Sequence, residues 1–214
     1  MKVLDGDILG VIDVQPTFMP GGALPVVDGA AVVPAINHLL ATRFSRAFAT
    51  QDWHPPGHVS FAATHGLAPF ATIALPSGPT QALWPEHGLA GSGEAALHPD
   101  LDLRNVEIVL RKGTRIDMDG YSAFHDNDRV STTGLAEMLR ARRVTRIFFA
   151  GLATDFCVGW SAEDAARLGF RAFVIEDACR AIDRPTGNGT TLDAMRARWQ
   201  AVGVTVTTMA AMLA

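Results

Sequence analysis

The stretch Arg146-Ile-Phe-Phe-Ala-Gly-Leu-Ala-Thr-Asp-Phe-Cys-Val-Gly-Trp160 carries the clearest information about the fold. Its apolar run from Ile147 to Phe149 predicts a buried strand. Thr154 and Asp155 are residues that often begin helices, and a helical pattern follows as far as Leu168. A buried strand that leads directly into a helix is the repeating unit of parallel α/β proteins, so this stretch predicts that fold class.

Cys157 falls in the first turn of the predicted helix, just after the strand. Unpaired backbone N–H groups and the helix dipole favour a thiolate at such a position. They can lower the pKa of a cysteine well below the ~8.5 of a free thiol. Most free cysteines are instead small buried apolar residues. The stretch alone therefore leaves two interpretations of Cys157, a nucleophile and a core residue.

Strands and helices alternate along the rest of the chain. We expect further strands at 8–15, 47–50, 106–110 and 172–176 and within 202–208, and helices at 28–40, 134–143 and 190–200. This alternation predicts a single α/β domain over residues 1–214, with three α/β/α layers around a six-stranded, parallel, Rossmann-like sheet. The segment 59–102 is long for a loop, so we expect it to be functional or to contain short elements.

Composition narrows the range of functions. The chain has 214 residues, is 48% hydrophobic and carries a net charge of −4, so no basic surface favours nucleic acid or an acidic membrane. The first residues lack the apolar core of a signal peptide, and no apolar run reaches membrane-spanning length. The two cysteines do not form a disulfide framework. We therefore expect a cytoplasmic protein with reduced thiols.

Four ionisable residues lie at or just after the carboxyl ends of predicted strands: Asp13, Asp52, Lys112 and Cys157. The carboxyl ends of parallel strands meet at one edge of a sheet, where α/β proteins form their sites. Each residue alone is weak evidence, because turns and surfaces commonly contain such residues. Together at one edge they predict a reactive site, in which the Lys112 ammonium would favour the anions of Asp13 and Cys157.

A second group of polar residues predicts a metal site. Asp52, His54 and His58 lie within seven residues, Pro55 and Pro56 stiffen the segment between them, and His87 follows in the long segment. Carboxylate and imidazole ligands without thiolate suit zinc, iron or manganese. The alternative is a surface loop that collects Asp and His residues without a metal.

Five motifs resemble those of a known family, the nicotinamidases or pyrazinamidases, which belong to the isochorismatase-like cysteine hydrolases. The motifs are Val11-Ile-Asp-Val-Gln15, Asp52-Trp-His-Pro-Pro-Gly-His58, Leu83-Trp-Pro-Glu-His87, Arg111-Lys-Gly-Thr114 and Gly151-Leu-Ala-Thr-Asp-Phe-Cys-Val158. They occur in the family's order. The Asp-Lys-Cys set is shared by the wider superfamily, whereas the Asp-Trp-His and Trp-Pro-Glu-His segments are typical of nicotinamidases.

The resemblance implies an activity and a division of roles. It implies metal-dependent hydrolysis of nicotinamide, and of pyrazinamide, to the acid and ammonia through a thioester, as a step of NAD salvage. Asp13, Lys112 and Cys157 would be catalytic, and the N–H groups of Ala153 and Cys157 would form the oxyanion hole. Asp52, His54, His58 and His87 would hold one divalent ion, with zinc preferred over iron or manganese and His58 either a ligand or a neighbour of the ligands.

The resemblance also places the substrate pocket. Phe18, Trp84, Tyr121 and Ala153 would line the space for the pyridine ring. A cis peptide bond is implied between Leu152 and Ala153. Gly88 departs from the many relatives that carry a cysteine there, which leaves the catalytic set intact.

Three questions remain open on the sequence alone. The substrate could be another small amide, or a vinyl ether as in true isochorismatases. Cys157 could instead be a redox-sensing thiol, with Cys179 the sole candidate as its resolving partner, although we expect Cys179 to be structural. The chain could act as a monomer or as a homo-oligomer.

Overall fold

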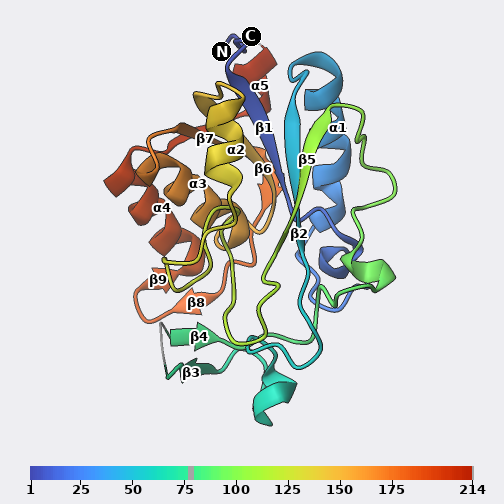
Figure 1. The fold of residues 1–214 in the computed structure, drawn as a ribbon, viewed down its shortest axis with the longest axis vertical. Coiled ribbons are helices and arrows are strands. Elements are labelled where there is room, and N and C mark those ends of the chain that lie inside the picture. The colour runs from blue at the N-terminus through green and yellow to red at the C-terminus, as the bar shows by residue number, and fades with distance from the viewer. Residues whose placement is uncertain (77–79, 214) are drawn as a thin grey trace.

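A six-stranded, fully parallel sheet forms the centre of the molecule (Figure 1). The structure, a computed structural model, describes residues 1–76 and 80–213. The strand order is β10-β7-β6-β1-β2-β5. The strands are β1 (Asp7–Ile12), β2 (Ala47–Asp52), β5 (Val106–Lys112), β6 (Arg146–Leu152), β7 (Arg171–Arg180) and β10 (Thr205–Thr207).

Helices cover both faces of this sheet, which gives the expected three layers. One face carries α1 (Val32–Thr42) and α5 (Met209–Leu213), and the other carries α2 (Leu135–Ala141), α3 (Cys157–Arg167) and α4 (Thr191–Val202). In Figure 1, α1 lies on one side of the sheet, and α2, α3 and α4 lie on the other. The predicted α/β class with a six-stranded parallel sheet is confirmed.

The two faces of the sheet are built from alternate residues of each strand. In β1, Leu9 and Val11 point into the core shared with α1, whereas Ile8 and Ile12 point into the core shared with α3. All residues of β1, β2 and β6 are buried, as expected for central strands covered on both faces. The apolar runs in the sequence therefore reflect two cores separated by a single sheet.

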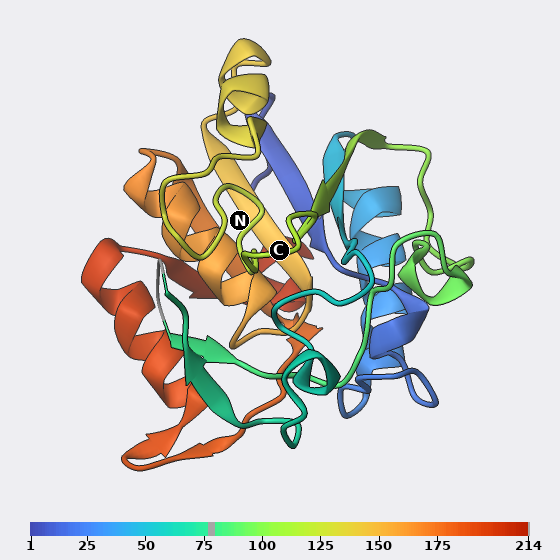
Figure 2. The same cartoon turned by 60° about the horizontal axis from the view of Figure 1, so that its bottom comes forward.

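After β5, the order in which successive strands are added to the sheet reverses. From β1 the chain moves outward through β2 to β5, and it then returns to β6, on the other side of β1, and continues outward through β7 to β10. The carboxyl ends of β1 and β6 therefore border a topological switch point, where sites form in doubly wound sheets. Figure 2 turns this end of the sheet toward the viewer, with the loops that surround it.

Several boundaries differ from the sequence expectations. The helix after β6 begins at Cys157, two residues after Asp155, because the carboxylate of Asp155 bonds elsewhere and does not cap the helix. The segment 59–102 contains 3-10 turns and the antiparallel pair β3 (Thr72–Ala74) and β4 (Thr80–Ala82). A second small pair of strands, β8 (Pro185–Thr186) and β9 (Gly189–Thr190), precedes α4.

Within the described part of the chain, no helix has the length and apolar character needed to cross a membrane.

Gly10 in β1 offers a test of how tightly the central sheet is packed. A Cβ atom there would lie 2.6 Å from the ring of Phe48 and 3.1 Å from the ring of Phe149. We predict that Gly10→Ala lowers the free energy of unfolding by about 1–3 kcal/mol, because a well-packed core does not accept an extra methyl group without strain. Urea denaturation measures the change. Gly93→Ala is the control, because its added methyl would meet nothing within 4 Å, and an equal loss of stability in both variants would contradict the prediction.

Candidate active site

Lys112 is the centre of a buried charged cluster at the carboxyl edge of the sheet. It is the last residue of β5, and its ammonium lies 2.9 Å from Asp13 Oδ2 and 3.2 Å from Cys157 Sγ. It also donates a hydrogen bond to Asp52 Oδ1, at the end of β2. The four residues that the sequence placed at this edge are therefore in direct contact through one side chain.

Asp13 is held firmly in this cluster. It follows β1 in a left-handed backbone conformation, with φ at 48°, and is completely buried. Its N–H donates to Thr50 Oγ1 at 3.1 Å, and the same hydroxyl donates back to Asp13 Oδ1 at 2.6 Å. One carboxylate oxygen is thereby fixed by Thr50, and the other faces Lys112.

Burial changes the proton affinity of these groups in different ways. Desolvation raises the pKa of Asp13, although Lys112 opposes the shift. Burial likewise raises the pKa of the Cys157 thiol well above its usual value, again against the effect of Lys112. The lowered thiol pKa that the helix start made possible is therefore not found in this structure, because desolvation and the carboxylates of Asp13 and Asp52 outweigh Lys112. A buried thiol beside a carboxyl group of raised proton affinity suits transfer of a proton between the two.

Backbone donors surround Cys157 at the start of α3. The peptide bond between Leu152 and Ala153 is cis, as the resemblance implied. Among the described residues, the N–H groups of Ala153 and Cys157 have no hydrogen-bond acceptor. They are therefore available to an anion formed next to the thiol.

Three of the predicted metal ligands converge on one point. Asp52 Oδ2 lies 3.6 Å from His54 Nε2 and 3.7 Å from His87 Nε2. Nδ1 of His54 lies 2.8 Å from the carbonyl oxygen of Gly113, and Nδ1 of His87 lies 2.8 Å from that of Pro85. A carbonyl only accepts, so both protons reside on Nδ1, and the Nε2 lone pairs are directed toward the carboxylate. This donor set fits one divalent ion.

His58 lies beside this cluster but is bonded differently. Its ring stacks on that of His54, with the centroids 4.1 Å apart, and Nδ1 accepts from the N–H of Ser60 at 3.3 Å. Its Nε2 lies 3.3 Å from the carbonyl oxygen of Met118, so the ring proton resides there. Burial and the proximity of His54 lower the pKa of His58 to about 4. A ring nitrogen of His58 also lies within 4.8 Å of donor atoms of His54 and Asp119, so His58 borders the three converging ligands.

Asp119 is a buried acidic residue of the site that sequence reasoning missed. Its Oδ2 accepts from Gln81 Nε2 at 2.9 Å and its Oδ1 from the N–H of Gly120 at 2.8 Å. Its carboxylate lies within 4.8 Å of donor atoms of His54 and His58, and it lines the pocket in front of Cys157. The Asp-Gly pair is typical of a turn, so only the three-dimensional fold shows that this carboxylate points inward.

The pocket in front of Cys157 has apolar, flat walls. The four predicted lining residues, Phe18, Trp84, Tyr121 and Ala153, all border it, joined by Leu24, Phe156 and Ile182, which the sequence had not indicated. Trp84 Nε1 donates to the hydroxyl of Tyr121 at 3.0 Å, and the Phe156 ring meets the Trp84 ring edge-on, 4.8 Å between centroids. A small aromatic ring suits such a slot.

A buried carboxylate fixes one wall of this pocket. Asp155 accepts hydrogen bonds from the N–H of Ile182 at 3.0 Å and of Asp183 at 2.9 Å, and from the hydroxyl of Thr191. It thereby joins the turn before Cys157 to the segment that carries Ile182. The position of this wall depends on a side chain two residues from the thiol.

Fold and site together define the class of protein. A doubly wound parallel sheet with a buried Cys-Asp-Lys cluster at its switch point is the arrangement of an α/β cysteine hydrolase. Residues 7–211 match the Isochorismatase domain, and the chain belongs to that family.

Named relatives are nicotinamidases. The chain is 48% identical to the nicotinamidase of Acinetobacter baylyi, over 86% of this chain and 85% of that protein. A solved nicotinamidase/pyrazinamidase of Acinetobacter baumanii superposes with a TM-score of 0.93, at 42% identity, over 99% of this chain and 100% of that one.

Two further solved structures contain informative ligands. A PnC1 structure from L. infantum, in complex with nicotinate, superposes with a TM-score of 0.83 at 35% identity, over 99% of this chain and 97% of that one. The pyrazinamidase of Pyrococcus horikoshii, in complex with zinc, superposes with a TM-score of 0.74 at 28% identity, over 95% and 99% of the two chains.

Asp155 provides a test of how the pocket wall is held. We predict that Asp155→Asn lowers the free energy of unfolding by about 1–3 kcal/mol, because the amide keeps one acceptor oxygen and leaves at least one of the part-buried donors without its partner. Thermal and urea denaturation measure the loss. Asp183→Asn makes the same chemical change at an exposed position and should be nearly neutral. Equal stability of the Asp155 variant and the parent protein would contradict the prediction.

Proposed function

We propose that the protein hydrolyses nicotinamide to nicotinate and ammonia, and pyrazinamide likewise, as a step of NAD salvage. The observation that carries the proposal is the contact of Lys112 with both Asp13 and Cys157 at the base of a slot for an aromatic ring. A thiol, a base and a cation in contact are the components of nucleophilic catalysis at a carbonyl carbon. The nicotinamidase relatives supply the substrate.

In the first half of the reaction, Asp13 takes the proton of Cys157 as the sulfur attacks the carboxamide carbon. Lys112 stabilises the thiolate as it forms, since its ammonium is 3.2 Å from the sulfur. The N–H groups of Ala153 and Cys157 donate to the oxyanion, which typically contributes ~3 kcal/mol per donor. Asp13 then returns its proton to the leaving nitrogen, ammonia departs, and a thioester remains on Cys157.

In the second half, water attacks the thioester carbon while Asp13 accepts its proton. The thiolate leaves and recovers a proton from Asp13, so the enzyme returns to its starting state and nicotinate is released. The raised pKa of Asp13 helps both halves, because the carboxyl group must hold a proton in each and release it again.

One divalent ion is part of the proposal, with zinc preferred and iron or manganese as alternatives. Asp52, His54 and His87 would hold it, in agreement with their convergence. When bound, such an ion supplies a Lewis acid beside the pocket that can hold the ring nitrogen of the substrate and lower the pKa of water. Asp119 and His58 would surround these ligands.

A redox-sensing role for Cys157 receives no support from the other thiol. Cys179 lies in β7 with its sulfur 3.9 Å from the carbonyl oxygen of Phe149, and burial raises the pKa of Cys179 to about 12. A thiol so seldom ionised is a poor resolving partner. The arrangement fits the structural role expected for Cys179.

Substitution of the two cysteines tests the nucleophile. We predict that Cys157→Ala folds but loses ammonia release from nicotinamide by ~1000-fold or more, because the thioester cannot form. Cys179→Ala is the matched control and should retain most of the activity. Similar activities of the two variants would exclude Cys157 as the nucleophile.

Elemental analysis tests the metal ligands. We predict one divalent ion per chain in the parent protein, its loss from His54→Ala and His87→Ala, and partial retention in His58→Ala, because the ring nitrogens of His58 are bonded to Ser60 and Met118. A chelator should abolish ammonia release, and added zinc should restore it. Full occupancy in both the His54 and His87 variants would rule out this site.

A further inference from the structure

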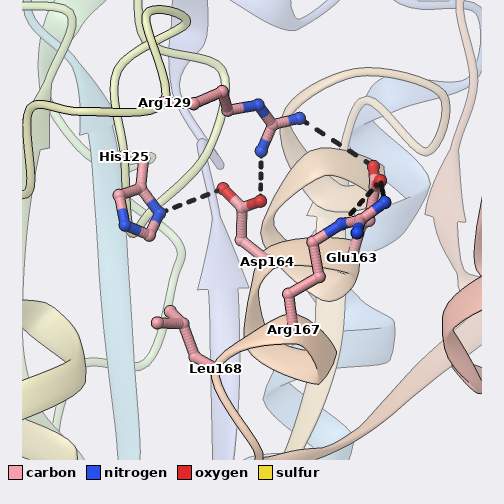
Figure 3. A pocket seen from close by; sticks show the side chains of 6 residues that line it. All are labelled: His125, Arg129, Glu163, Asp164, Arg167 and Leu168. Atoms are coloured by element: carbon pink, nitrogen blue, oxygen red, sulfur yellow. Dashed lines mark hydrogen bonds and ion pairs between the residues drawn. The ribbon is translucent and has the colours of Figure 1, made fainter.

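A second cluster of charged side chains lies on the outer side of α3, away from the pocket in front of Cys157. A cavity of about 340 Å³ is bordered there by His125, Arg129, Glu163, Asp164, Arg167 and Leu168 (Figure 3). Glu163 and Asp164 are each only 3% exposed. Buried carboxylates on a helix surface require covering groups: the segment 113–134 covers Asp164, and Arg198 of α4 also binds Glu163.

Arg129 makes the principal charged contact between this segment and the helix. Its guanidinium donates to Asp164 Oδ1 and lies 4.0 Å from Glu163 Oε2 (Figure 3). His125, from the same segment, places its Nδ1 3.4 Å from Asp164 Oδ2. Arg129 adopts a left-handed backbone conformation, with φ at 61°, which non-glycine residues rarely do. The segment is thus bent in a way that brings this arginine onto α3.

The same guanidinium reaches toward the active site through an aromatic ring. Arg129 lies 4.2 Å from the ring centroid of Trp160, and Trp160 lies 5.3 Å from the ring of Tyr121. Tyr121 is a wall of the pocket in front of Cys157. Arg129, Trp160 and Tyr121 therefore form a continuous path from the outer cluster to that wall.

The rest of the segment transmits the position of Arg129 to the pocket. The N–H of Asn127 donates to the carbonyl oxygen of Asp119 at 2.7 Å, and Asn127 Oδ1 accepts from the N–H of Tyr121 at 3.1 Å. The N–H of Ala123 donates to Ser161 Oγ at 2.9 Å, and this hydroxyl donates to the carbonyl oxygen of Cys157. Asn127 thus fixes the backbone of Tyr121 within the segment, and Ala123 joins the segment to Ser161 of α3.

We propose that Arg129 is a positioning residue for nicotinamide binding: by clamping the segment 113–134 onto Asp164 and Trp160 of α3, it holds Tyr121 in place as a wall of the ring pocket. This inference rests on the proposed function. Arg129 touches no reacting group, so it acts through Tyr121. Since Tyr121 would contact the ring in the ground state and the transition state alike, loss of the clamp removes uniform binding, which raises KM and leaves kcat nearly unchanged.

The chain contains a matched control for this arginine. Arg167 donates to the same Glu163, at 2.9 Å, from one turn further along α3. Its side chain is 59% exposed, and in the part of the chain that the structure describes it forms no hydrogen bond or ion pair with the segment 113–134. Arg129→Met and Arg167→Met thus remove the same charge from the same cluster, but only the first removes the clamp.

The test combines kinetics with hydrogen exchange on the metal-loaded protein. In Arg129→Met, we expect KM for nicotinamide to rise on the order of tenfold, with kcat within about threefold of the parent. Amide exchange in peptides that cover Tyr121 and Ala123 should accelerate by about tenfold or more, because both N–H groups lose their fixed acceptors. Arg167→Met should match the parent in both measurements.

Each result decides the proposal. Faster exchange with an unchanged KM would make Arg129 a merely structural residue and overturn the inference, as would unchanged exchange. If Arg129→Met does not fold, Arg129→Lys replaces it, because lysine keeps the charge but cannot contact Asp164, Glu163 and Trp160 together. A smaller rise in KM is then expected, and parent values would contradict the proposal. Should the parent protein release no ammonia from nicotinamide, the proposed function fails, while exchange still reports whether Arg129 orders the segment.

Discussion

The burial of one ammonium group among two carboxylates and a thiol is the constraint on which the site depends. Lys112 is 2% exposed and Asp13 is completely buried, and an isolated charge in either place would be strongly unfavourable. Their contact removes that cost only if β1, β2 and β5 end, and α3 begins, at the same edge of the sheet. The parallel sheet meets this condition because its strands deliver their carboxyl ends to one edge.

Two buried aspartates share this lysine and yet differ in proton affinity. Burial dominates at Asp13 and raises its pKa, whereas at Asp52 burial is opposed by the Lys112 ammonium and by other neighbouring groups, so the pKa of the Asp52 carboxyl falls well below its usual range. Environments that separate the pKa values of neighbouring acids also separate their roles. A carboxylate that stays ionised suits a metal ligand, and one that takes up a proton suits a general base.

The sequence predicted what depends on regular structure and missed what depends on long-range contacts. Asp13, Lys112 and Cys157 lie at or just after the ends of strands, so their meeting could be inferred from alternating strands and helices. The inward direction of Asp119 could not, because it is set by Gln81 and by the fold of a turn. The raised pKa of the Cys157 thiol was missed for a related reason: a helix start is visible in the sequence, but the depth of burial and the distance to Asp13 are not.

The chemistry and the pocket walls rest on different parts of the fold. Strand ends fix the charged cluster, whereas Ile182 and Tyr121 stand on loops that are tied down by Asp155, just before α3, and by Asp164 within it. Loops tolerate sequence change far better than central strands. A change in the hydrogen bonds and ion pairs of Asp155 and Asp164 would therefore alter the shape of the pocket while Lys112 and its partners stay in place. One cysteine hydrolase fold can thus serve different small substrates, since the reacting groups and the groups that recognise the substrate vary independently.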